Sequence, residues 1–133
     1  MLAYDVRARR IDAHGTEMTA KESLLLVDTD PQGRRDAFNP AELLLAALGA
    51  CIVKGAERVL TPLQFRLAGL EVKLHATRQD EPPRLSAIDY EIIVDTDEPD
   101  HRIELLHTNI RRYGTISNTL ALAVPIAGRI RRR

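Results

Sequence analysis

The residue best suited to chemistry in this sequence is its single cysteine, Cys51. A thiol reacts as its thiolate, and its pKa falls beside cationic groups and rises in apolar surroundings. Lys54 follows about one helical turn later, and an arginine from a loop or from another subunit is an alternative source of positive charge. Beside a small pocket, such a thiolate attacks the O–O bond of a peroxide and becomes a sulfenic acid. Apolar walls favour an organic hydroperoxide over hydrogen peroxide, because only the former has an alkyl group to bury.

Other reactive groups in the sequence have less support. The four histidines show no familiar metal-ligand spacing with cysteine or carboxylates: they are His14, His75, His101 and His107. The sequence also lacks a glycine-rich phosphate loop and a G-x-S-x-G motif. We therefore expect neither a metal nor a cofactor.

Cys51 lies in a stretch that predicts a long central helix. Asn39 is a good N-cap, a proline follows it, and Glu42 stands three residues after the cap, where its carboxylate can reach the cap amide. Residues 43–53 carry no charge, so this part of the helix is apolar on every side. We expect a helix of about 20 residues that ends at Thr61-Pro62.

A helix without a polar face must be covered on all sides, and a small chain has little material for this. Small residues at a spacing of four, Ala47, Cys51 and Gly55, with Ala46 and Ala50 beside them, would let another backbone approach closely. We therefore expect the sheet of the chain on one side of the helix and a second copy on the other. The alternative is an ordinary core, in which Cys51 is an inert buried thiol.

Length and composition predict a single soluble domain, residues 1–133. One cysteine excludes an intrachain disulfide, and the N-terminus lacks a signal-peptide pattern, so we expect a cytoplasmic protein. The uncharged run of the helix is too short to cross a bilayer. Basic and acidic residues balance at 19 each, and residues 129–133 form the one basic cluster. We therefore expect no nucleic-acid partner, and we interpret this cluster as a solvated terminal strand.

Hydrophobic periodicity predicts the remaining elements. Helical spacing indicates an amphipathic helix over about 99–112 and a short third helix that ends near Leu122. Alternating or short apolar segments indicate strands at 2–11, 16–19, 23–27, 70–77, 88–94 and 124–131. The order of three strands, long helix, two strands, two helices and a strand indicates an α+β domain with mainly antiparallel sheet.

Three segments resemble a known family, the OsmC/Ohr superfamily of osmotically inducible protein C and the organic hydroperoxide resistance proteins. The segment 39–51, NPAELLLAALGAC, is similar to the central-helix motif of that family, and 81–94 and 112–120 are similar to its second half, especially in the YhfA-like branch. The resemblance covers nearly the whole chain. It implies an OsmC-like fold, with mainly antiparallel sheets around a long buried helix, and an intertwined homodimer with sites at the subunit boundary.

The resemblance also implies roles for particular residues. In active members a helix cysteine attacks the peroxide and a second cysteine resolves its sulfenic acid; Cys51 matches the first, whereas the second position falls at Gly114, which carries no thiol. The catalytic glutamate corresponds to Ala41, with Glu42 one residue later and turned about 100° around the helix. The catalytic arginine has no certain counterpart: a gapless count places His14 there, and Arg10, Arg34 and Arg35 are unranked substitutes.

Two functional hypotheses follow. The first is a one-cysteine, thiol-dependent reductase of organic hydroperoxides, in which Cys51 and Glu42 are catalytic and Arg34, Arg35 and Lys54 bind substrate or stabilise the thiolate. Its partners are a second copy of the chain, a hydroperoxide and an external thiol. The second is a non-enzymatic dimeric module that binds a small apolar or thiol-bearing ligand, or has only a structural role. In that case Glu42 is a helix cap and the two arginines belong to a solvated loop.

Overall fold

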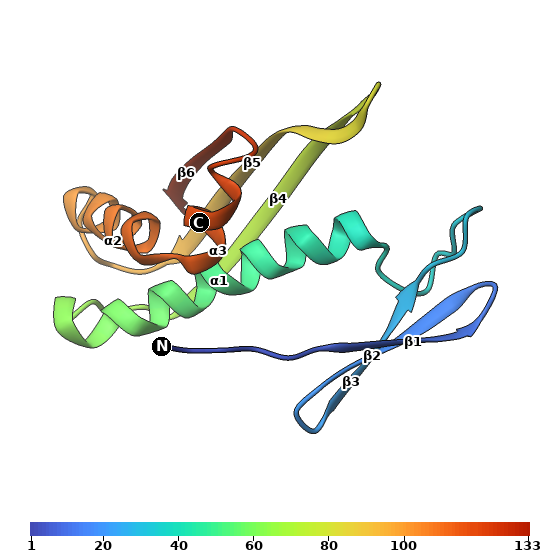
Figure 1. Cartoon of the computed structure of the whole chain (residues 1–133). Coiled ribbons are helices and arrows are strands. Elements are labelled where there is room, and N and C mark those ends of the chain that lie inside the picture. Colours follow the sequence, from blue (N-terminus) through green and yellow to red (C-terminus); the bar gives the residue numbers. More distant parts are fainter. The chain divides into compact units, whose positions relative to one another are not determined.

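A computed structural model describes all 133 residues, which form two compact units, Met1–Leu44 and Leu45–Arg133. Figure 1 shows the elements in chain order. They are β1 (Arg7–Asp12), β2 (Gly15–Ala20), β3 (Ser23–Asp28), α1 (Pro40–Leu63), β4 (Gly69–Asp80), β5 (Pro83–Asp95), α2 (Asp100–Tyr113), α3 (Thr115–Leu120) and β6 (Ile126–Arg132). The predicted α+β order is therefore confirmed.

The first unit contains an antiparallel meander of β1, β2 and β3. Arg9 and Glu17 are paired across β1 and β2 and form an ion pair at 3.2 Å. The turn between these strands is held by the Asp12 carboxylate, which accepts hydrogen bonds from the backbone amides of His14 and Gly15 at 2.8 and 3.1 Å. This is the local hydrogen bonding that makes aspartate favourable in turns.

The first strand begins later than its sequence pattern predicts. Strand pairing starts at Arg7, whereas the alternation of apolar and polar residues begins at Leu2. Leu2, Tyr4 and Val6 are 81%, 78% and 63% exposed. Alternation detects an extended chain with one apolar side, but a strand also needs a neighbour to bond, and residues 2–6 have no partner in the meander.

The second unit contains a three-stranded sheet in the order β4-β5-β6. The hairpin of β4 and β5 is antiparallel, in agreement with the mainly antiparallel sheet that the sequence predicts, and Figure 1 shows its tip extending past the helices of this unit. β6 runs parallel to β5, because the chain crosses over through α2 and α3 between these two strands. The sheets are thus mainly antiparallel with one parallel pair.

One face of the second sheet forms the core of the unit. Ile88, Ile92 and Val94 alternate along β5 and are at most 1% exposed. They belong to one apolar cluster with Leu48 from α1 and Leu106 from α2, both fully buried. Burying each such side chain contributes about 1.5 to 3 kcal/mol, so this cluster fixes both helices on the sheet.

The start of α1 follows its sequence signal. The Asn39 side chain accepts a hydrogen bond from the Glu42 amide at 2.8 Å, and the Asn39 amide donates to Glu42 Oε1 at 2.9 Å. This reciprocal pair is a capping box.

The end of α1 lies beyond the predicted one, because the helix continues through Pro62 to Leu63. In the last turn a proline removes only one hydrogen bond, which the helix tolerates. Gln64 then takes a left-handed conformation with φ of 49°, and the Phe65 amide donates to the Leu60 carbonyl at 2.9 Å. This hydrogen-bond pattern, a Schellman motif, ends the helix.

Glycines let α1 lie close to its neighbours. A Cβ at Gly49 would come within 3.0 Å of Leu74 Cδ1 on β4, and one at Gly55 within 3.7 Å of Ile110 Cγ2 on α2. Gly55, which we expected in the row that faces another subunit, therefore packs against α2 of its own chain. Ala50 and Val53 lie on an exposed side of α1, and Val53 is 40% exposed.

The arginines at the end of the chain pair with carboxylates of the same unit. Arg129 and Arg131 both contact Glu91, at 2.6 and 3.3 Å, Arg132 contacts Asp100, and Arg133 contacts Glu71. The first two hold the pKa of the Glu91 carboxyl below its usual value, mainly through the Arg129 hydrogen bond. The basic cluster is therefore largely neutralised by intramolecular ion pairs. None of the helices combines the length and apolar character that crossing a membrane requires.

Candidate active site

Cys51 is held by the most buried part of α1. Its neighbours on the helix, Leu48 and Ile52, are fully buried against the sheet, whereas Cys51 is only half-buried. Because a helix turns by about 100° per residue, Cys51 points to the side of the contact with the sheet rather than into it. Its sulfur is thus anchored by a rigid element without being enclosed in the core.

The sulfur of Cys51 lies beside Gly114, the residue between α2 and α3. A Cβ built on Gly114 would be 3.4 Å from Cys51 Sγ, which is ordinary van der Waals contact. The same Cβ would be 3.1 Å from the hydroxyl oxygen of Ser117. Gly114 has φ of −78° and ψ of 114°, a conformation that every residue type adopts. The structure therefore brings Cys51, Gly114 and Ser117 together, with a glycine where the family resemblance implies a second thiol.

The helices on either side hold Gly114 in this place. Ile110, one turn earlier on α2, is buried against Gly55 of α1. The Gly114 carbonyl accepts a hydrogen bond from the Asn118 amide at 2.9 Å, which begins α3. The junction is therefore determined by packing on α1 and by a helix start, so its distance from Cys51 does not depend on a loop conformation.

Two other predicted site residues lie on α1. Glu42 is exposed in the first turn, and its Oε1 is engaged in the capping box with Asn39. Lys54 is exposed about one turn after Cys51 on the same helix. Ala41, which stands where the resemblance implies a glutamate, is exposed and adjacent to Glu42.

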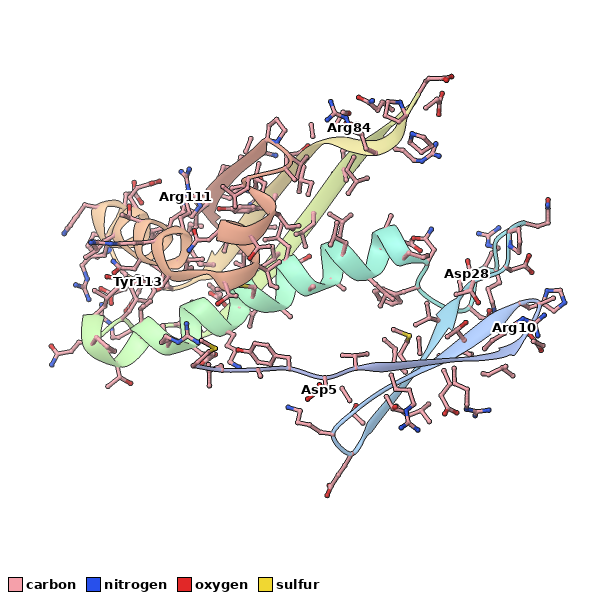
Figure 2. The ribbon with its side chains drawn as sticks, in the orientation of Figure 1. Asp5, Arg10, Asp28, Arg84, Arg111 and Tyr113 are labelled. Carbon is pink, nitrogen blue, oxygen red and sulfur yellow. The ribbon has the colours of Figure 1, made fainter.

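The candidate arginines of the first unit differ in their surroundings. Arg34 reaches the turn of the first hairpin, where its Nη1 donates to the His14 carbonyl oxygen at 3.5 Å. A Cβ at Gly15 would be 2.9 Å from the same nitrogen. Arg34 is thus the arginine that lies beside His14, the position the gapless count selects, whereas Arg35 is exposed in the loop and Arg10 is exposed on β1. Figure 2 places Arg10 and Asp28 at the loop end of this sheet.

The charge of Arg34 is already paired. Its Nε and Nη2 donate to the two carboxylate oxygens of Asp36 at 2.6 and 2.8 Å. This hydrogen bonding raises the pKa of Arg34 and lowers the pKa of Asp36. A bidentate pair of this kind orients the guanidinium group and competes with any substrate anion for it. The loop itself is tied down by the buried Asp28, whose Oδ2 accepts from the Arg34 amide at 3.0 Å.

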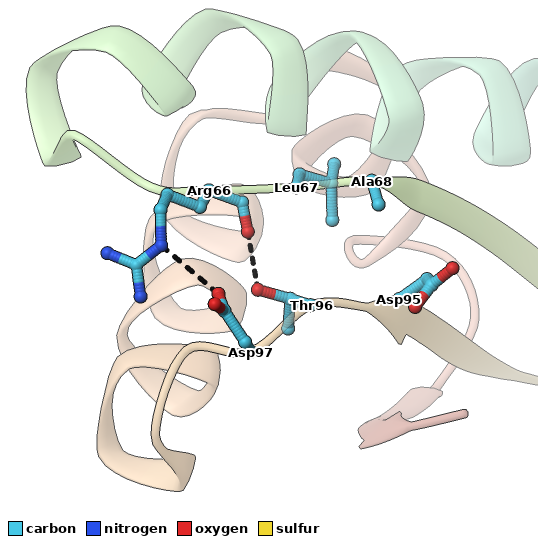
Figure 3. A pocket seen from close by; sticks show the side chains of 6 residues that line it. All are labelled: Arg66, Leu67, Ala68, Asp95, Thr96 and Asp97. Carbon is cyan, nitrogen blue, oxygen red and sulfur yellow. Dashed lines mark hydrogen bonds and ion pairs between the residues drawn. The ribbon is translucent and has the colours of Figure 1, made fainter.

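A pocket of about 580 Å³ lies in the second unit and involves none of these residues. Figure 3 shows its lining, from Arg66, Leu67 and Ala68 before β4 and from residues 95–97 at the end of β5. Arg66 Nε donates to Asp97 Oδ1 at 3.1 Å, and Thr96 Oγ1 donates to the Arg66 carbonyl oxygen. These contacts join the segment before β4 to the end of β5, so the pocket lies at the connection between the two strands.

Comparison with known protein families shows which family the chain belongs to. A family model described as OsmC-like protein matches residues 32–127. The chain belongs to the OsmC-like protein family. The match includes Cys51, Gly114 and Ser117, and it confirms the family that the sequence segments indicate. No curated protein sequence is significantly similar to this OsmC-like protein.

Solved structures agree with this assignment. An OsmC-like protein from Mycoplasma pneumoniae superposes with a TM-score of 0.91 at 17% identity and covers 98% of this chain and 97% of its own. An organic hydroperoxide resistance protein OsmC from Legionella pneumophila has a TM-score of 0.73 at 17% identity, covering 98% and 97%. The organic hydroperoxide resistance protein OhrB of Bacillus subtilis has a TM-score of 0.69 at 18% identity, covering 98% of each chain. At sequence identities of 17% to 18%, the similarity to these structures is a similarity of fold.

Sequence reasoning missed the role of Ser117 at this site. It is not among the residues predicted to form the site, yet its hydroxyl oxygen and Cys51 Sγ lie 3.1 and 3.4 Å from the same Cβ position at Gly114. The available signal was its spacing: Ser117 follows Gly114 by three residues, so one turn of a helix that begins at Gly114 returns its side chain to that position.

Proposed function

We propose that this OsmC-like protein is a one-cysteine, thiol-dependent organic hydroperoxide reductase that acts as a cytoplasmic homodimer. The observation that carries the proposal is the position of Cys51: half-buried on a rigid helix, with its sulfur 3.4 Å from the Cβ position of Gly114. Family membership and the names of two structural relatives, organic hydroperoxide resistance proteins, support the substrate class.

The reaction needs no group other than a peroxide and two equivalents of thiol. The Cys51 thiolate attacks one oxygen of ROOH, the O–O bond breaks, and Cys51 becomes a sulfenic acid while ROH leaves after taking a proton. A first external thiol condenses with the sulfenic acid to give a mixed disulfide and water. A second thiol releases the Cys51 thiol and leaves as the oxidised disulfide, so two electrons pass from thiols to peroxide.

Gly114 suits this role for an external reductant. A cysteine there would resolve the sulfenic acid within the chain, because its Cβ would lie 3.4 Å from Cys51 Sγ; with a glycine at this position, a thiol from another molecule must do so. Ser117 places a hydroxyl oxygen 3.1 Å from the same Cβ position. The external thiol would thus take the place of the missing resolving cysteine.

The other proposed roles follow from charge. Lys54, about one turn after Cys51 on α1, would supply positive charge near the substrate. Arg34 and Arg35 would contribute positive charge that binds the substrate. Glu42 would act as the carboxylate of the site once its hydrogen bond to Asn39 is exchanged for one to a substrate or to an arginine.

The homodimer is supported by apolar side chains that the single chain leaves uncovered. In the first unit these include Leu2, Tyr4, Leu24 and Leu25, which are between 46% and 81% exposed. Apolar patches of this kind mark interaction surfaces. Light scattering on a size-exclusion column tests this part of the proposal: a mass of twice 14.9 kDa supports it, and the monomer mass contradicts it.

A second candidate function is a non-enzymatic module that binds a small apolar or thiol-bearing ligand. The observations that favour it are the engagement of Glu42 in the capping box and of Arg34 with Asp36. Both groups have structural partners, as residues without a catalytic role do.

Chemical trapping distinguishes the two candidates. The purified protein is treated with cumene hydroperoxide and dimedone, and the tryptic peptide containing Cys51 is examined by mass spectrometry. A dimedone adduct that forms within the mixing time supports the reductase. A thiol that stays unmodified while free dithiothreitol in a parallel sample is oxidised would refute it and favour the binding module. Cys51→Ser is the control for adducts at other residues.

A further inference from the structure

A buried polar pair fastens α2 to the second sheet. The hydroxyl of Tyr90 on β5 and Nε2 of His107 on α2 are 2.8 Å apart, and each residue is only 6% exposed. Their rings meet edge to face, with centroids 5.7 Å apart and an angle of 84°. This side-chain hydrogen bond joins two elements whose other core contacts are apolar, such as those of Ile103, Leu106 and Ile110.

The neighbouring strand is shaped to fit the tyrosine ring. Gly128 on β6 is paired with Tyr90, and a Cβ at Gly128 would be only 2.0 to 2.3 Å from three ring atoms. The ring therefore lies directly on the Gly128 backbone, which fixes the direction of the hydroxyl group toward His107. The β4 partner of Tyr90 is Leu74, so both strands beside it present uncharged residues.

The surroundings of His107 favour its neutral form. Burial lowers its pKa most, the Arg111 charge one turn later on α2 lowers it further, and Glu104 on the other side raises it. From the sheet, Tyr90 is the titratable group that faces it, and burial raises the pKa of that hydroxyl. The pair is thus held neutral at neutral pH, and a proton added to His107 places a cation among apolar side chains beside Arg111.

The helix that this pair fastens ends at the candidate active site. Gly114 follows α2 directly, and Ile110 packs on Gly55 between His107 and that end. We propose that the Tyr90–His107 hydrogen bond is an acid-sensitive latch, which holds α2 on the sheet at neutral pH and releases it, with the junction beside Cys51, when His107 takes up a proton. The latch goes beyond the proposed reductase activity and does not depend on it.

Hydrogen exchange of the whole protein tests the latch. Exchange rates of α2 and α3 amides are measured at several pH values from 7.5 to 5.0 and divided by the rates of unstructured amides at the same pH. In the parent we expect the resulting protection to fall by up to about tenfold per pH unit once His107 begins to protonate. His107→Gln keeps an acceptor for the Tyr90 hydroxyl but takes up no proton, so its protection should be independent of pH.

Two further variants complete the test. His101→Gln removes an exposed histidine from the same helix and should behave as the parent does. Tyr90→Phe removes the hydroxyl and should show the lowered protection already at pH 7.5. The rate of Cys51 alkylation is also measured in the parent and in His107→Gln, and the parent rate is divided by the variant rate, so that the effect of pH on the thiol itself cancels. This ratio should be near one at pH 7.5 and should rise several-fold at pH 5.0. Equal pH dependence in parent and His107→Gln, or none in the parent, would overturn the proposal.

Discussion

Replacing Gly114 by cysteine should create a disulfide with Cys51. The Cβ of the new residue would lie 3.4 Å from Cys51 Sγ, and the backbone at Gly114 has φ and ψ that cysteine adopts without strain. Ser117 must move by a few tenths of an ångström, because its Oγ and Cβ are 3.1 and 3.3 Å from the new Cβ. Such a shift of one small side chain is well within the flexibility of a partly buried helix.

The magnitude of the effect follows from the length of the loop that the bond closes. Positions 51 and 114 differ by 63 in residue number (114 − 51 = 63), and the chain-entropy estimate for a loop of that size is about 4 kcal/mol at 25 °C. Strain reduces this amount, so we expect the oxidised Gly114→Cys protein to be more stable than its reduced form by about 2 to 4 kcal/mol. For a domain of this size that corresponds to a rise in Tm on the order of 10 °C.

The assay compares oxidised and reduced samples of the same variant. Thiol titration should find no free thiol after mild oxidation, peptide mapping should identify the link between residues 51 and 114, and calorimetry should give the difference in Tm. Thr115→Cys is a matched control, because its side chain leaves the backbone one residue later and in another direction. If Thr115→Cys forms the bond as readily as Gly114→Cys, or if Gly114→Cys keeps two free thiols, the placement of Gly114 beside Cys51 is wrong.

Three further predictions concern the frame around the site. Asn39→Ala removes half of the capping box and should lower the free energy of unfolding by about 0.5 to 2 kcal/mol in urea titration, whereas a value unchanged from the parent would show that the box does not stabilise α1. Gly128→Ala should lower the free energy of unfolding by about 1 to 3 kcal/mol, because its methyl group collides with the Tyr90 ring. Combining Gly128→Ala with Tyr90→Leu should recover part of this loss, and no recovery would refute the clash. The pKa of Glu98 is lowered, first by its hydrogen bond from the Arg66 amide and then by that from Arg102, so its contribution to stability is present above its ordinary pKa and is lost as the pH falls through the folded value. Glu98→Gln should therefore flatten the acid side of the plot of stability against pH, and an unchanged acid side would contradict this role.

Local signals predicted the central helix because they act over a few residues. Asn39 and Glu42 form the expected capping box since both partners lie within one turn. The end of the helix was less predictable: Pro62 is a strong local signal, but the helix ends where Gln64 can adopt a left-handed conformation and Phe65 can bond back to Leu60. The two alternating segments 70–77 and 88–94 indicated the strands of the second hairpin, whereas no local pattern indicated that β6 pairs with β5 in parallel.

The site could be predicted only in part. The importance of Cys51 followed from composition and from the family resemblance, whereas its distance from Gly114 depends on how α2 packs against Gly55, a contact between residues far apart in the chain. The same is true of Tyr90 and His107, which each fit an ordinary apolar pattern and reveal their hydrogen bond only when α2 is placed on β5. Contacts of this kind carry no local periodicity, so a single sequence does not contain a signal for them.

The pairing of Arg34 with Asp36 shows another feature that the sequence alone did not predict. One residue separates them in the chain, and the loop around them was expected to be polar, but charge alone did not indicate which arginine would be ordered. The ordering comes from the buried Asp28, which accepts a hydrogen bond from the Arg34 amide and so fixes the direction of its side chain.

The most direct test of the central claim is turnover of an organic hydroperoxide by the parent and by Cys51→Ser with dihydrolipoamide or dithiothreitol as the external thiol. Consumption of cumene hydroperoxide is followed against a protein-free blank, and hydrogen peroxide serves as the comparison substrate. We predict that the parent consumes the organic hydroperoxide catalytically, and faster than hydrogen peroxide, while Cys51→Ser matches the blank. Equal rates for the parent and Cys51→Ser would contradict the account, because Cys51 would then not be the nucleophile.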